Sequence, residues 1–181
     1  MPTITPGAGR IKRLKHELLD MKALSEKCPA IKFKVLDDSD APEKYEVSFF
    51  LRTIIGEIKE KPVYREADMP SIFLIDLSQY PYSYIRTSSI TIPPPFHPCF
   101  LENGQFDISS SWSDSLANII IHIAKALQFN YIITCSFNVE AEVWIEKNKH
   151  KRYFPCDDTV IPDFKDIHKT IPIQRKDDVN A

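Results

Sequence analysis

The sequence predicts an α+β fold: one helix, then a four-stranded antiparallel sheet, then two further helices. Three observations predict it. Apolar residues recur at helical spacing in residues 10–27, short β-branched and aromatic runs occupy residues 30–92, and helical spacing returns after residue 113. Helices and strands that follow one another in separate blocks are typical of α+β domains.

The first helix is predicted over residues 10–27. Ile11, Leu14, Leu18 and Met21 share one face, and Cys28-Pro29 ends the run. The outer face of its first two turns is basic, which indicates either an ordinary solvated face or a surface for a partner. The basic residues are Arg10, Lys12, Arg13 and Lys15.

Four runs predict the strands of an antiparallel meander. They are "AIKFKV" at residues 30–35, "YEVSFFLRTII" at residues 45–55, "SIFLIDL" at residues 71–77, and residues 88–92. Residues 57–70, which include two prolines, are predicted to connect the second strand to the third.

A proline-rich segment follows the fourth strand, "IPPPFHPCFLENGQFDISSSW" at residues 92–112. Prolines 93–95 have no amide hydrogen to donate, so they cannot continue a central strand. We expect an ordered loop in which Phe96, Phe100 and Trp112 act as anchors.

Two helices complete the predicted domain. The central one spans residues 113–129, with Ser113 as its cap and a face rich in isoleucine. Asn138 is predicted to cap the other, in which Ala141, Trp144, Ile145 and Asn148 share a face. We therefore expect a flexible N-terminus at residues 1–9, a domain at residues 10–155 and a tail at residues 156–181.

Composition limits the class of protein. The chain has 181 residues, of which 43% are hydrophobic and 27% charged, the size of one globular domain. Its net charge of −2 and pI near 6.2 give no overall attraction to nucleic acid or to an acidic membrane surface, so we expect neither as a partner. The first residues form no apolar signal segment, which predicts a cytoplasmic protein.

The four cysteines indicate neither a zinc site nor a disulfide framework. Cys28, Cys99, Cys135 and Cys156 are scattered, with no CxxC pair and no His/Cys ligand spacing. We expect reduced thiols, no metal and no cofactor.

Five motifs in this order resemble the ubiquitin-conjugating (UBC) family. Tyr80-Pro81 matches its Tyr-Pro-Phe turn, and His97-Pro98, sixteen residues later, matches the first two residues of its His-Pro-Asn motif. Gly104 matches the glycine of its active-site flap, Trp112 matches the tryptophan before its central helix, and "NVEAEVWIEKN" resembles its Asn-x-Glu-Ala-Ala helix.

The resemblance covers residues 10–154 and implies a UBC-like fold. It also implies two partners, a ubiquitin-like protein and a cognate activating enzyme, the latter docking on the first helix at Arg10, Lys12, Arg13 and Lys15. The tail is similar to that of divergent bacterial members that are encoded beside their own activating enzymes.

The match fails at the catalytic positions. The family's nucleophilic cysteine lies eight residues after the motif asparagine, where this chain has Asp107, and the asparagine itself is replaced by Cys99. An acyl-aspartate is a mixed anhydride that water hydrolyses quickly, so Asp107 is not a simple replacement for the nucleophile.

Several interpretations stay open at this point. The chain is a catalytically silent variant, or Cys99 is a relocated nucleophile tuned by His97 or Asp107. Alternatively, a hydroxyl of Ser109, Ser110 or Ser111 carries an oxyester. A different class is a non-enzymatic adaptor, similar to RWD domains, that binds a ubiquitin-like protein without transferring it. Whichever of these holds, the resemblance implies that His97, Cys99, Asp107 and the serines at 109–111 converge around one shallow groove, with Cys99 next to Asp107.

Overall fold

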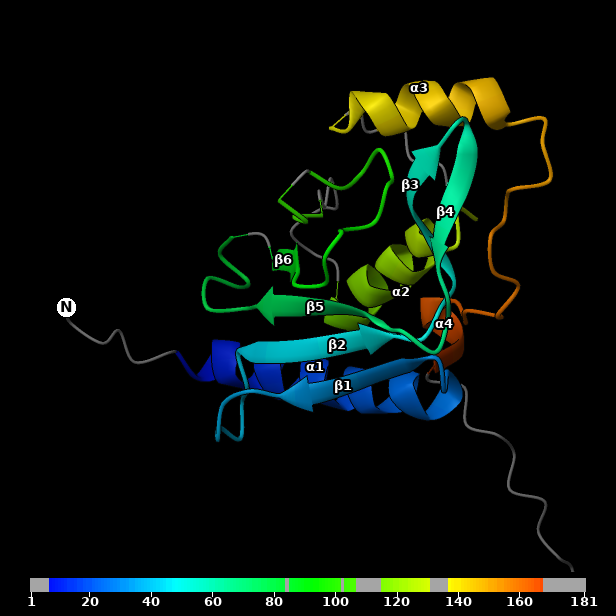
Figure 1. Ribbon diagram of the computed structural model, residues 1–181. Helices are drawn as coiled ribbons and strands as arrows, with labels where there is room; N and C mark the ends of the chain where they lie inside the picture. The colour runs from blue at the N-terminus through cyan, green and yellow to red at the C-terminus, as the bar shows by residue number, and fades with distance from the viewer. Residues whose placement is uncertain (1–6, 84, 102, 107–114, 131–136, 168–181) are drawn as a thin grey trace, which may run out of the picture.

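The computed structural model describes residues 7–83, 85–101, 103–106, 115–130 and 137–167, and it confirms an α+β arrangement. Figure 1 shows its elements. In chain order they are α1 (Ala8–Lys27), β1 (Ile31–Val35), β2 (Lys44–Phe49), β3 (Thr53–Ile58), β4 (Lys61–Arg65), β5 (Ser71–Asp76), β6 (Arg86–Ser89), α2 (Leu116–Leu127), α3 (Val139–Asn148) and α4 (Phe164–Ile167).

The predicted four-stranded antiparallel meander is confirmed. The strand order is β1-β2-β5-β6, and each neighbouring pair is antiparallel. Phe33 pairs with Val47, Val47 with Phe73, and Phe73 with Ser89, so one row of side chains crosses the whole sheet. The fourth strand begins and ends earlier than the predicted residues 88–92.

The prediction for residues 45–70 is wrong. The run at residues 45–55 is divided between β2 and β3, and β3 pairs with β4 in a separate two-stranded sheet instead of continuing the meander. The hairpin turn consists of Lys59 and Glu60, with φ angles of 51° and 63°. Such turns usually carry Gly or Asn, so this one gives no recognisable sequence signal. Pro62 is accommodated because a two-stranded sheet has only edge strands.

Both later helices exist where they were predicted, but α2 is shorter than the predicted residues 113–129 at both ends. The cap of α2 is Ser115, whose hydroxyl accepts a hydrogen bond from the amide of Asn118, while Ser113 lies outside the described residues. The predicted cap of α3 is confirmed, because Asn138 accepts from the amide of Ala141 at 3.0 Å. Its predicted buried face is also confirmed, with Ala141, Trp144, Ile145 and Asn148 all buried.

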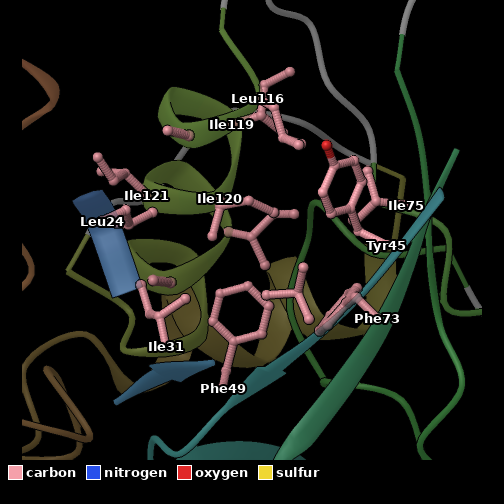
Figure 2. Packing of buried hydrophobic residues seen from close by; sticks show 14 of the residues in the cluster. Leu24, Ile31, Tyr45, Phe49, Phe73, Ile75, Leu116, Ile119, Ile120 and Ile121 are labelled. Carbon is pink, nitrogen blue, oxygen red and sulfur yellow. The ribbon is translucent and has the colours of Figure 1, made fainter. Parts of the chain in front are cut away.

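The main core lies between the sheet and the two long helices. Figure 2 shows α2 side chains such as Ile120 facing Phe49 and Phe73, whose rings meet edge to face at 5.4 Å. Each fully buried side chain of this size contributes about 1.5–3 kcal/mol through the hydrophobic effect. α1 packs along β1 and α2 and contributes Leu14 and Met21 to the same core.

A second, smaller cluster joins α3 to the β3–β4 hairpin. Its buried members are Ile54, Phe129, Trp144, Ile145 and Cys156. The chain after residue 155, which we expected to be a tail, contributes Cys156 to this cluster and Ile167 to the main core. Within the described ranges, no helix is long and apolar enough to cross a membrane.

A buried carboxylate connects three parts of the fold. Glu17 of α1 is 0% exposed, and among the described residues three donors reach it. They are Nε of Arg13 at 2.7 Å, the hydroxyl of Tyr80 at 2.8 Å and the amide of Leu116 at 2.7 Å. The Leu116 amide belongs to the first turn of α2, where backbone amides have no carbonyl partner within the helix. Glu17 therefore serves as a second cap for α2.

We predict that Glu17→Ala lowers the free energy of unfolding by about 3 kcal/mol, because it leaves buried donors without an acceptor. Glu17→Gln should lose less, since its carbonyl oxygen still accepts from one of them. Urea denaturation measures both, with the exposed Glu26→Ala on the same helix as a control that changes stability by less than about 0.5 kcal/mol. Equal values for Glu17→Ala and Glu26→Ala would contradict the role given to this carboxylate.

Candidate functional site

The first part of the proline-rich segment (residues 93–106) is held against the β3–β4 hairpin. Nη2 of the buried Arg65 donates to the carbonyl of Pro93 at 2.7 Å, and the amide of Phe96 donates to the carbonyl of Ile54 at 2.8 Å. The prolines that cannot pair as a strand therefore still lie on a fixed backbone. Glu102 and residues 107–112, which we also expected to be ordered, lie outside the described residues.

His97, Pro98 and Cys99 form a buried turn. Nδ1 of His97 accepts a hydrogen bond from the amide of Cys99 at 3.1 Å. The carbonyl of Pro98 accepts from the amides of Phe137 and Asn138, both at 3.1 Å, at the start of α3. Because Nδ1 is an acceptor, the neutral ring carries its proton on Nε2. The turn thus joins the segment to α3. The Nδ1 lone pair of His97 accepts a hydrogen bond within the turn and stabilises its conformation.

The ring of His97 lies between two phenylalanines from different clusters. It meets Phe100 of the main core at 5.9 Å and Phe129 of the second cluster at 4.8 Å, both edge to face. The side chain is 0% exposed. His97 therefore packs as an aromatic residue where the two clusters meet.

Cys99 is also 0% exposed and belongs to the main core. A nucleophile must reach the carbonyl carbon that it attacks, and a fully enclosed thiol does not do so in this conformation. The structure thus places His97 and Cys99 inside the protein, which differs from the surface groove that we expected. The other candidates, Asp107, Ser109, Ser110 and Ser111, lie outside the described residues.

Gly104 is required where the segment turns back onto β6. Its φ is +79°, and a Cβ there would lie 2.8 Å from the carbonyl oxygen of Ser89. The close approach serves a contact, because the amide of Ser89 donates to the carbonyl of Gly104 at 2.8 Å. Phe106 follows and packs on Phe100 at 4.9 Å in the main core.

The predicted basic face of α1 is only partly exposed. Arg10 is buried, at 8% exposure, and its guanidinium donates to the carbonyls of Leu77, Ser78 and Tyr80 at 3.1, 3.0 and 2.7 Å. It also pairs with Glu43 at 2.6 Å. The expectation that Arg10 is available to a partner is therefore wrong. The residue holds together the turn that contains the cis Tyr80-Pro81 bond.

Arg13, Lys12 and Lys15 occupy different environments. Arg13 pairs with Glu17 and bonds the Tyr80 hydroxyl, although 40% of its side chain remains exposed. Lys12 is exposed, and the side chain of Lys15 is 52% exposed with a long contact of 3.9 Å to Asp40. The two lysines are thus more exposed than Arg13 and, unlike it, are not bonded to the buried Glu17.

The remaining described cysteines are structural. Burial raises the pKa of Cys28, and burial beside Asp157 raises the pKa of Cys156 to about 12. Both thiols are therefore protonated at neutral pH. Within the described part of the chain, no three His, Cys, Asp or Glu side chains gather as metal ligands.

Sequence reasoning missed Glu17 and Arg65. A signal for Glu17 was present, because Arg10, Leu14, Glu17, Met21 and Leu24 fall at alternating spacings of four and three, and all five are buried. A carboxylate inside an apolar helical stripe indicates a buried, bonded group. No comparable pattern marks Arg65, whose partners depend on how the hairpin folds onto the proline-rich segment.

Comparison with known proteins gives limited information. No protein-family model and no curated protein sequence matches the chain. Among solved structures, it is similar to the Plasmodium vivax ubiquitin conjugating enzyme E2, with 17% identity and a TM-score of 0.46. The match covers 64% of this chain and 98% of that one. This degree of similarity assigns no residue role and no reaction to the present chain.

We predict that Gly104→Ala destabilises the protein by about 1–3 kcal/mol, because an alanine combines a positive φ with a clash against Ser89. Gly56→Ala is the matched control, since a Cβ there meets no atom within 4 Å. Thermal or urea unfolding of the two variants checks the difference. If both behave alike, the segment does not depend on its contact with β6.

Proposed function

We propose that this chain is a UBC-like protein of a ubiquitin-like conjugation pathway that is catalytically silent and works by docking. On this proposal it binds a ubiquitin-like protein or that protein's activating enzyme and passes no acyl group onward. The chain order of helix, antiparallel sheet, proline-rich segment and two later helices supports it. So do the UBC-like motifs, which lie at Tyr80-Pro81, His97-Pro98 and Gly104.

The observation that carries the silent assignment is the 0% exposure of Cys99, together with the bond from its amide to His97. Acyl transfer by Cys99 would need this turn to open, which would break the contact of Pro98 with α3 and the packing of His97. A buried cysteine of this kind behaves as a small apolar residue.

The proposal predicts that no covalent adduct forms. With ubiquitin, its activating enzyme and ATP, and with any ubiquitin-like protein encoded near this chain, wild type and Cys99→Ala should both remain unmodified on non-reducing gels. Asp107→Cys is the positive control, because it places a thiol at the position of the family's nucleophile. A new thiol-sensitive adduct in this variant alone would support a conjugating site that has lost its nucleophile.

Other outcomes would contradict the silent assignment. A wild-type adduct that thiols cleave and Cys99→Ala abolishes would make Cys99 the nucleophile. An adduct that survives thiols, yields to strong base and disappears in alanine variants of Ser109, Ser110 or Ser111 would indicate an oxyester. Binding to none of these proteins would contradict the docking role itself.

The docking surface on α1 gives a separate prediction. Lys12→Glu/Lys15→Glu should weaken binding of the activating enzyme by about tenfold, with a melting temperature near that of wild type, because exposed charges contribute little to stability. Lys32→Glu/Lys61→Glu, with the same change in net charge at exposed lysines outside α1, is the control. Titration by calorimetry measures both. Equal weakening by the two variants would indicate a general charge effect instead of a surface on α1.

A further inference from the structure

The outer face of α3 carries an exposed apolar pair. Val139 is 61% exposed and Val143 is 47% exposed, while the residues on the other side of the helix are buried. Glu146 continues the line, so its members are spaced four and three residues apart, and α3 ends two residues later at Asn148. Residues with this spacing lie on one side of a helix, the side that a second helix would contact if it packed here. In Figure 1, α3 lies at the top of the molecule, with its buried face toward the β3–β4 hairpin.

Charges flank this line in a regular order. Glu140 and Lys147 lie along one side of it, seven residues apart, and Glu142 and Lys149 lie along the other side at the same spacing. Each side is therefore acidic near the start of the helix and basic near its end. If a second copy of α3 lies antiparallel to the first, the acidic residues of each helix therefore face basic residues of the other.

An antiparallel second copy fits this arrangement. The register that we consider places Val143 opposite Glu146 of the second copy. In the same register Glu140 faces Lys147 of the second copy, and Glu142 faces Lys149. A parallel copy would instead bring Glu140 beside Glu142 and Lys147 beside Lys149, which repel. Opposed helix dipoles also favour the antiparallel orientation.

We propose that the outer face of α3 is a self-association surface, on which two copies of this chain pair through antiparallel α3 helices about a two-fold axis. The pairing is weak, because a helix of ten residues covers less area than a standard stable interface. A dissociation constant on the order of 100 µM fits this size class. Lys149 pairs with Glu146 of its own chain at 2.7 Å, and in the pair of copies it lies between this carboxylate and Glu142 of the second copy.

Two complementary variants of the full chain test the proposal. Glu140→Lys/Glu142→Lys makes all four flanking residues basic, and Lys147→Glu/Lys149→Glu makes them all acidic. Each variant alone should associate at least tenfold more weakly than wild type, because like charges face one another. An equimolar mixture should associate at least as tightly as wild type, because every pair across the interface is then of opposite charge. Sedimentation equilibrium up to about 1 mM protein, at low salt and at 0.5 M NaCl, measures this.

The control for net charge is Asp38→Lys/Asp158→Lys, which alters two exposed carboxylates away from α3 by the same amount as the first variant. It should associate as wild type does. All changes lie outside the buried face of α3, and circular dichroism melts check that each variant is folded.

Any of three results with these variants would overturn the proposal, and so would a fourth from the salt dependence. The three are a wild-type chain that stays monomeric at 1 mM, variants that associate as wild type does, and a mixture that stays monomeric. Association that persists with equal strength at high salt would point to apolar contacts elsewhere on the chain and would also overturn it. None of these results depends on binding to a ubiquitin-like protein or an activating enzyme, so this proposal and the proposed function fail separately.

Discussion

The buried carboxylate of Glu17 is the constraint on which the arrangement of this protein depends. Removing an ionised carboxylate from water costs several kcal/mol unless donors replace the water. The donors come from α1 itself, from the Tyr80 turn and from the first turn of α2, so α1 has one rotation about its axis in which all of them reach Glu17. That rotation also turns Arg10 toward the carbonyls of the Tyr80 turn and leaves Lys12 facing solvent. The internal requirement of one acid therefore decides which cations of α1 remain available to a partner.

The two hydrophobic clusters are joined at the turn that contains the candidate residues His97 and Cys99. Phe100 belongs to the main core and Phe129 to the second cluster, and the ring of His97 touches both. Pro98 fixes the start of α3 on the same turn. A turn with these contacts cannot open without separating the clusters, whereas a nucleophile needs an exposed position. Because this turn holds the two clusters together, it argues for docking instead of acyl transfer by Cys99.

Much of the fold could be predicted from the sequence, because the periodicity of apolar residues directly reflects which side chains are buried. This applies to α1, β1, β5 and the buried face of α3, and the cap at Asn138 was equally local. The β3–β4 hairpin could not be predicted, since Lys59 and Glu60 adopt left-handed conformations without a residue type that favours them. For the candidate site, the special backbone at Gly104 was foreseeable from the scarcity of glycine. The burial of Arg10 and Cys99 was not, because it depends on contacts with residues distant in sequence.

The two helices on which we propose binding surfaces belong to different clusters, which keeps these surfaces apart. α1 packs in the main core, whereas the buried face of α3 packs in the second cluster with the hairpin. They lie at opposite ends of the molecule in Figure 1. Association through α3 would therefore leave Lys12 and Lys15 uncovered on both copies. In such a pair each copy could bind one partner molecule. If the two partner molecules belong to one assembly, binding of the first raises the effective concentration of the second binding site. A protein that catalyses no reaction can act only through the affinity and the geometry of its binding. Two linked binding sites would increase that affinity.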